Sequence, residues 1–118
     1  MQNYKKLFVW EESHKLVLDL YRITKLFPQN ERFGITSQLR RSAVSVPANI
    51  AGGYGRYTTN DNTARFFQIA LGSLNESEYY MLLAKELTYI NETEFKNLTI
   101  LLNNVKAMLL SLLKRMRT

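Results

Sequence analysis

The sequence predicts an all-α protein, an antiparallel up-and-down four-helix bundle that occupies residues 1–118 as a single domain. Three observations lead to this prediction. Apolar residues recur at helical spacing in four separate segments. Short polar stretches with proline, glycine or cap-forming residues separate these segments. No segment alternates apolar and polar residues as a half-buried strand does. Helices joined by short loops pack antiparallel to their neighbours, which gives a bundle.

The first helix is expected over residues 9–27. Val17, Leu20 and Phe27 recur on one side at spacings that place them on the same face. Pro28 is expected to end this helix, because its ring disfavours helical geometry in the preceding residue and its nitrogen carries no proton to donate.

The second helix is expected to begin near Gly34 and to contain Pro47. An interior proline removes one backbone hydrogen bond and costs about 3 kcal/mol unless a kink absorbs it. We therefore expect a bend between Ala43 and Pro47. The glycines of the GGYG segment at 52–55 are expected to end the helix, since glycine adopts the left-handed conformation of helix C-termini without steric cost.

Polar side chains share one face of this second helix. At about 100° per residue, a narrow arc contains Gln38, Arg41, Ser45 and Asn49, and continues through Gly52 to Arg56. The other faces are apolar or small, apart from Arg40, which we expect to face solvent. Covered polar groups need internal partners, a neighbouring subunit or a ligand. The stripe is therefore either a polar network or subunit contact, or a surface for phosphate groups.

The third helix is expected over residues 60–87, where apolar side chains surround much of the circumference. This breadth suggests burial against a partner chain as well as against its own bundle. The fourth helix has the clearest local signature, a capping box in which Asn91 caps the helix and Glu94 reaches back. Its seam follows alternating steps of four and three residues: Leu98, Leu102, Val105, Leu109, Leu112 and Met116.

Charge is unevenly distributed along this basic chain, which has 16 Lys and Arg against 10 Asp and Glu, a net charge of +6. Residues 33–60 and 95–118 contain no acid, whereas acids outnumber bases in residues 61–94. The bases either balance the acidic helix or attract a polyanion. For the second case, the candidate nucleic-acid contacts are Arg41 and Arg56 together with a flank of the last helix, formed by Lys96, Lys106, Lys114 and Arg117.

Several functions lack the residues that they need. The chain has no cysteine and one histidine, so we expect neither a disulfide nor a metal site. The polar stripe offers no base or acid beside a nucleophile, and no phosphate-binding loop motif occurs, so we expect no enzymatic activity and no cofactor. Tyr54 and Tyr57 are the aromatic residues nearest to exposed arginine. Without a membrane-spanning or signal segment, we expect a cytoplasmic protein that does not contact membranes.

Several motifs are similar to those of a known family: VW at 9–10, ERFG at 31–34, SVPANIA at 45–51 and ALGSLNE at 70–76. The pattern resembles the bacterial four helix bundle proteins first associated with intervening sequences in 23S ribosomal RNA genes. This resemblance implies a ring-shaped homopentamer without established enzymatic activity. A weaker similarity to accessory proteins of diversity-generating retroelements implies RNA or DNA and a reverse transcriptase as partners. The family usually has an acid at the position of Gly52, so here the polar stripe is left more positive.

Two functional hypotheses follow. The first is a non-enzymatic, oligomeric, basic bundle that acts as a nucleic-acid-associated adaptor. The alternative is a structural or protein-interaction ring that binds no nucleic acid, in which the basic residues balance the acids of the third helix. The two differ in salt dependence, because phosphate neutralisation makes binding weaken steeply as salt rises.

Overall fold

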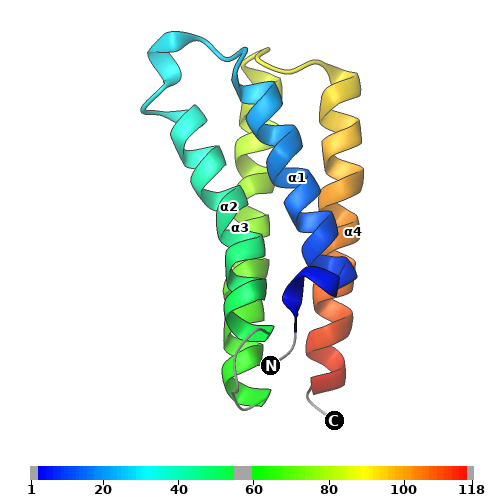
Figure 1. Cartoon of the computed structure of the whole chain (residues 1–118). Helices are drawn as coiled ribbons and strands as arrows, with labels where there is room; N and C mark the ends of the chain where they lie inside the picture. The colour runs from blue at the N-terminus through cyan, green and yellow to red at the C-terminus, as the bar shows by residue number, and fades with distance from the viewer. Residues whose placement is uncertain (1–2, 55–59, 117–118) are drawn as a thin grey trace.

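The computed structural model describes residues 3–54 and 60–116. Its long helices are α1 (Phe8–Thr24), α2 (Ile35–Tyr54), α3 (Asn60–Glu86) and α4 (Glu92–Met116), and two short 3-10 turns, η1 (Tyr4–Lys6) and η2 (Gln29–Glu31), precede α1 and α2. Consecutive helices run in opposite directions, and both ends of the chain lie at the same end of the molecule (Figure 1). Each helix packs on the next, and α4 returns to α1. The predicted four-helix bundle is confirmed.

Every long helix contributes to one apolar core. Leu20, Leu39, Leu74 and Leu102 are completely or almost completely buried, and they come from α1, α2, α3 and α4 respectively. Along each helix, buried apolar residues recur at spacings of three or four positions, which gives the helix one inward-facing stripe. Within the described residues, none of the helices combines the length and the apolar character that crossing a bilayer would require.

Helix α1 ends three residues earlier than expected, at Thr24. The amides of Leu26 and Phe27 donate to the carbonyls of Ile23 and Thr24 at 3.1 Å, which closes tighter turns in place of the α-helical pattern. Phe27 is still buried. Its apolar character therefore indicated burial correctly, although the residue lies beyond the end of the helix.

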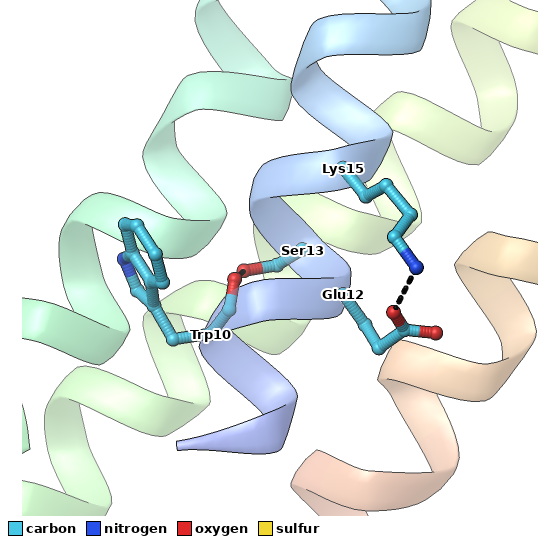
Figure 2. Close-up of polar contacts among 4 residues, drawn as sticks. All are labelled: Trp10, Glu12, Ser13 and Lys15. Carbon is cyan, nitrogen blue, oxygen red and sulfur yellow. Dashed lines mark hydrogen bonds and ion pairs between the residues drawn. The ribbon is translucent and has the colours of Figure 1, made fainter. Parts of the chain in front are cut away.

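Two local polar contacts lie in the first half of α1 (Figure 2). The buried Ser13 hydroxyl donates to the Trp10 carbonyl at 2.9 Å, and the Lys15 ammonium donates to Glu12 at 2.8 Å. The hydrogen bond and charge of Glu12 raise the pKa of Lys15. Because the ammonium is exposed, solvent screens this pair and its contribution to stability is small.

Helix α2 continues through Pro47, and its ribbon changes direction partway along, so that the N-terminal half leans outward (Figure 1). This is the bend that the interior proline predicted. Pro47 is buried, so its ring adds to the core at the point where it removes a backbone hydrogen bond.

The glycines of α2 correct a prediction. Gly52 and Gly53 lie inside the last turn of the helix, and no described glycine has a positive φ, so these two do not end α2 by a left-handed cap. They make room for Phe66 of α3 instead. A Cβ atom on Gly53 would lie 2.7 Å from the Phe66 Cβ, and one on Gly52 would lie 3.1 Å from its ring. Gly55 lies outside the described residues.

The connection between α3 and α4 is a Schellman turn. The Tyr89 amide donates to the Ala84 carbonyl at 2.8 Å, and the Thr88 amide donates to the Lys85 carbonyl at 2.9 Å. Thr88 occupies the left-handed position with a φ of 66°, where glycine is usual. A β-branched residue is strained in this conformation, so the turn is held by its hydrogen bonds against a local cost.

The start of α4 confirms the predicted capping box. The Glu94 amide donates to the Asn91 side chain at 2.7 Å, and the Asn91 amide donates to the Glu94 carboxylate at 3.0 Å. The seam is confirmed through Leu109. Beyond it Leu113 is buried and Leu112 is half-buried, because a straight helix with 3.6 residues per turn drifts away from a strict seven-residue repeat.

Apolar side chains also remain exposed on α3, as its broad apolar pattern predicted. Ile69, Tyr79 and Leu82 have 48%, 58% and 40% of their surfaces accessible in the single chain. Whether a second chain covers them stays a prediction.

A matched pair of glycine variants tests the contact between α2 and α3. Gly53→Ala is expected to lower the free energy of unfolding by about 1–3 kcal/mol, because the new methyl group overlaps Phe66. Gly72→Ala is expected to raise it by about 0.5–1 kcal/mol, since alanine favours the helix and a Cβ there meets nothing within 4 Å. Urea denaturation measures both, and equal effects would contradict the proposed role of Gly53.

A second pair tests the strain at Thr88. Thr88→Gly is expected to raise the free energy of unfolding by about 1 kcal/mol, because glycine adopts a positive φ without the Cβ penalty. Thr88→Ala keeps a Cβ atom and is expected to gain much less. A loss of stability in Thr88→Gly, measured by the same denaturation, would show that the turn is not strained.

Candidate anion-binding groove

The predicted polar stripe of α2 divides into an inward and an outward part. Ser45 and Asn49 are half-buried: the Ser45 hydroxyl accepts from the Ser73 hydroxyl of α3 at 2.8 Å and from the Asn49 amide at 3.0 Å. Gln38 and Arg41 are exposed. Arg56 lies outside the described residues. The stripe therefore mixes groups with internal partners and groups that are open to a ligand.

The inward part belongs to a polar network between α2 and α3. Ser42 of α2 and Ser77 of α3 are buried, and their hydroxyls share a hydrogen bond of 2.8 Å. The Ser77 hydroxyl also lies 2.9 Å from the Ser73 carbonyl. A buried network with satisfied groups fixes the register of two helices, which favours a structural role for Ser45 and Asn49.

The expected basic flank of α4 is spread along the helix, and one of its cations is already paired. Lys96 and Lys114 are exposed but lie 18 positions apart, about 27 Å along the axis at the helical rise. Lys106 projects about 80° away from them around the helix and pairs with Glu78 of α3 at 3.4 Å. Arg117 lies outside the described residues. In the described part of α4, the basic side chains are therefore dispersed or partly neutralised.

Arg40 also differs from its prediction, because it is half-buried. Its Nε donates to the Thr24 hydroxyl at 2.8 Å, and its guanidinium lies 4.5 Å from the centre of the Tyr21 ring. The apolar stem of an arginine packs well on such a surface while the charged head stays near water. Contacts with α1 thus hold this guanidinium in place.

Arg40 lies in a groove of about 560 Å³ between α1 and the N-terminal half of α2. The lining residues are Tyr21, Arg32, Phe33, Thr36, Ser37, Arg40, Arg41, Val44 and Ser45. A second groove, of about 250 Å³, shares Arg32, Thr36 and Arg40 with the first and adds Lys25. Together the two linings contain four cationic side chains and no carboxylate.

Glu31 is the one acid within residues 25–45, and neither groove is lined by it. The Tyr89 hydroxyl donates to its carboxylate at 2.7 Å. This hydrogen bond raises the pKa of Tyr89. The bond also joins the α3–α4 connection to η2, which directly precedes Arg32. The same hydrogen bond therefore engages the Glu31 carboxylate and fixes the segment that carries Arg32.

Two aromatic rings line the larger groove beside its arginines. The Arg32 guanidinium lies 5.4 Å from the centre of the Phe33 ring, which is 87% exposed. Tyr21, under Arg40, is the second ring. Sequence reasoning had pointed to Tyr54, which is half-buried, and to Tyr57, outside the described residues. The Arg32–Phe33 dipeptide in a polar connector was a usable signal, but no local signal links Tyr21 to Arg40.

The helices and the groove together define a four-helix-bundle protein with a basic surface at the α1–α2 end. Residues 5–111 match the family described as 23S rRNA-intervening sequence protein. The chain therefore belongs to this family, as its motifs indicated. The weaker similarity to retroelement accessory proteins stays a prediction.

A solved structure supports the fold. The protein is similar, with a TM-score of 0.82, to the crystal structure of a protein of unknown function from the S23 ribosomal protein family of Bacteroides thetaiotaomicron. The two share 23% identity over 90% of this chain and 98% of that one. Comparison with curated proteins finds no match.

A pair of arginine variants tests the geometry of the groove. Arg40→Gln is expected to lower the free energy of unfolding by about 1–2 kcal/mol, because it removes both the hydrogen bond to Thr24 and the contact with the Tyr21 ring. Arg41→Gln, at an exposed neighbouring position, is expected to change it by less than about 0.5 kcal/mol. Similar values for both in urea denaturation would contradict the anchoring of Arg40.

Proposed function

We propose that the protein is a non-enzymatic, nucleic-acid-associated adaptor that holds a phosphodiester backbone in the groove between α1 and α2. The observation that carries this proposal is the lining of the two adjoining grooves, where Lys25, Arg32, Arg40 and Arg41 occur without a carboxylate. Arginine binds phosphate oxygens through parallel N–H donors, which suits this ligand. The two grooves share Arg32, Thr36 and Arg40 and so form one basic track, and its four cations suit a chain of phosphates better than a single anion.

The start of α2 adds to this field. Its first turn contains no acidic residue of its own, and the acid beside the positive end of the helix is Glu31, whose Oε1 lies against Gly34. Thr36 and Ser37 of that turn line the groove. An anion in the groove thus approaches the positive end of a 20-residue helix as well as the arginines.

The cations of α4 have a different role in this proposal. Lys96 and Lys114 contribute to the overall positive field, which accelerates the approach of a polyanion, whereas Lys106 is already paired. A homo-oligomeric ring, as the family resemblance implies, repeats the groove around an axis and strengthens weak binding through multivalency. A reverse transcriptase remains a candidate partner on the weaker resemblance alone.

The alternative is a protein-interaction ring that binds no nucleic acid. Exposed apolar side chains near the groove favour it: Leu26 is 81% exposed and Phe33 is 87% exposed. Residues of this kind often mark contacts between proteins.

A salt series with charge-matched variants separates these functions. Fluorescence anisotropy follows the binding of a mixed-sequence, single-stranded 20-mer of RNA or DNA to the wild type, to Arg32→Gln/Arg41→Gln, and to Lys96→Gln/Lys114→Gln. Both double variants remove two exposed cations. The groove variant is expected to bind about tenfold more weakly and to flatten the logarithmic salt dependence by roughly 1.4, the value for two phosphate contacts on a single strand. The α4 variant is expected to lose less than about threefold.

Two results would overturn the proposal. Equal losses in both double variants would show that net charge, not the groove, binds the ligand. Absence of binding by the wild type at low salt would support the protein-interaction alternative.

A further inference from the structure

Phe33 is the most exposed large apolar side chain in the described part of the molecule, with 87% of its surface accessible. It lines the same groove as Arg32, Arg40 and Arg41. A phenylalanine ring in water forgoes the favourable free energy of burying its apolar surface. A ligand that covers an aromatic ring and carries negative charge would fit this position.

The backbone around Phe33 is held in place. The Arg32 amide donates to the Gln29 carbonyl at 3.1 Å, and the Gly34 amide donates to the Glu31 carbonyl at 2.9 Å. The hydrogen bond between Glu31 and Tyr89 ties the same segment to the α3–α4 connection. The ring is thus carried by a fixed turn, which lowers the entropic cost of binding to it.

A second ring lines the same groove. Tyr21 is 39% exposed, and the Arg40 guanidinium lies 4.5 Å from the centre of its ring. The Arg32 guanidinium likewise lies 5.4 Å from the centre of the Phe33 ring. Aromatic surfaces beside guanidinium groups are the combination by which single strands are held, since bases stack on the rings while cations follow the backbone.

We propose that the groove binds unpaired nucleotides, with a base stacked on Phe33 and the neighbouring phosphates on Arg32, Arg40 and Arg41. The inference rests on the proposed function and adds the class of nucleic acid. In a duplex, the bases stack on one another and offer no free face, whereas every base of a single strand has one. Phenylalanine has no hydrogen-bonding group, so its recognition of bases tolerates any sequence.

Three probes and one conservative variant test this inference. Equilibrium binding is measured at low salt for a single-stranded oligo(dT) of twelve residues, the oligo(dT)·oligo(dA) duplex of the same length, and linear polyphosphate. The wild type is expected to bind the single strand about tenfold more tightly than the duplex. Phe33→Leu keeps an apolar side chain but removes the ring, so it is expected to lose about tenfold on the single strand and less than about twofold on the other probes.

Leu26→Ala is the matched control. Leu26 is also highly exposed and lies at the same end of the bundle, but it lines neither groove. Its truncation is expected to leave all three affinities unchanged within about twofold. An equal loss in Leu26→Ala and Phe33→Leu would point to general apolar contact and would overturn the stacking proposal.

A direct optical readout uses Phe33→Trp. The wild type has one tryptophan, Trp10, so the fluorescence change of the variant in excess of the wild type reports on position 33. Oligo(dT) is expected to quench this additional fluorescence, because a base stacks on the indole, and polyphosphate is expected to leave it unchanged. Equal quenching by both probes would contradict stacking.

The remaining outcomes separate this inference from the proposed function. Equal affinity for single strand and duplex, or no effect of Phe33→Leu, would overturn stacking while leaving phosphate binding in place. Absence of binding to all three probes would overturn both. A lower molar mass of Phe33→Leu in light scattering without nucleic acid would assign Phe33 to a contact between protein chains and would overturn the inference.

Discussion

The close packing of α2 on α3 is the constraint on which the rest of the molecule depends. Serines from both helices meet in a buried network, with hydroxyl contacts of 2.8 Å at two levels, and Gly53 lets Phe66 approach the last turn of α2. Small side chains let two helices come close, and hydrogen bonds fix their register. Burying these hydroxyls without partners would be costly, so the two helices must meet in this one alignment.

That alignment decides where the basic surface lies. One side of α2 is taken by α3, and Pro47 lets the N-terminal half of the helix lean outward (Figure 1). A groove then remains between this half and α1, and Arg40 is anchored inside it by Thr24 and Tyr21. Packing in the core and charge at the surface are therefore coupled through a single helix.

The distribution of charge follows the same division. Cations near α3 meet its acids, as in the pair of Lys106 with Glu78 at 3.4 Å, and a further pair joins Lys85 to Glu92 at 3.1 Å. The α1–α2 end differs, because Glu31, the one acid within residues 25–45, accepts a hydrogen bond from Tyr89 and does not line the groove. The charge distribution thus differs between two places: acids and bases pair between α3 and α4, whereas the linings of the two grooves contain cations and no carboxylate.

The sequence by itself determined the features that depend on neighbours along the chain. The four helices follow from apolar spacing, and the capping box of Asn91 and Glu94 follows from a local motif, because both use interactions within a few residues. The glycines at 52 and 53 were misassigned since their role depends on Phe66, which only helix packing brings near. The groove was missed for the same reason. Arg40, Tyr21 and Arg32 come together through the crossing of α1 and α2, and only the tertiary structure decides which side chains meet across that distance.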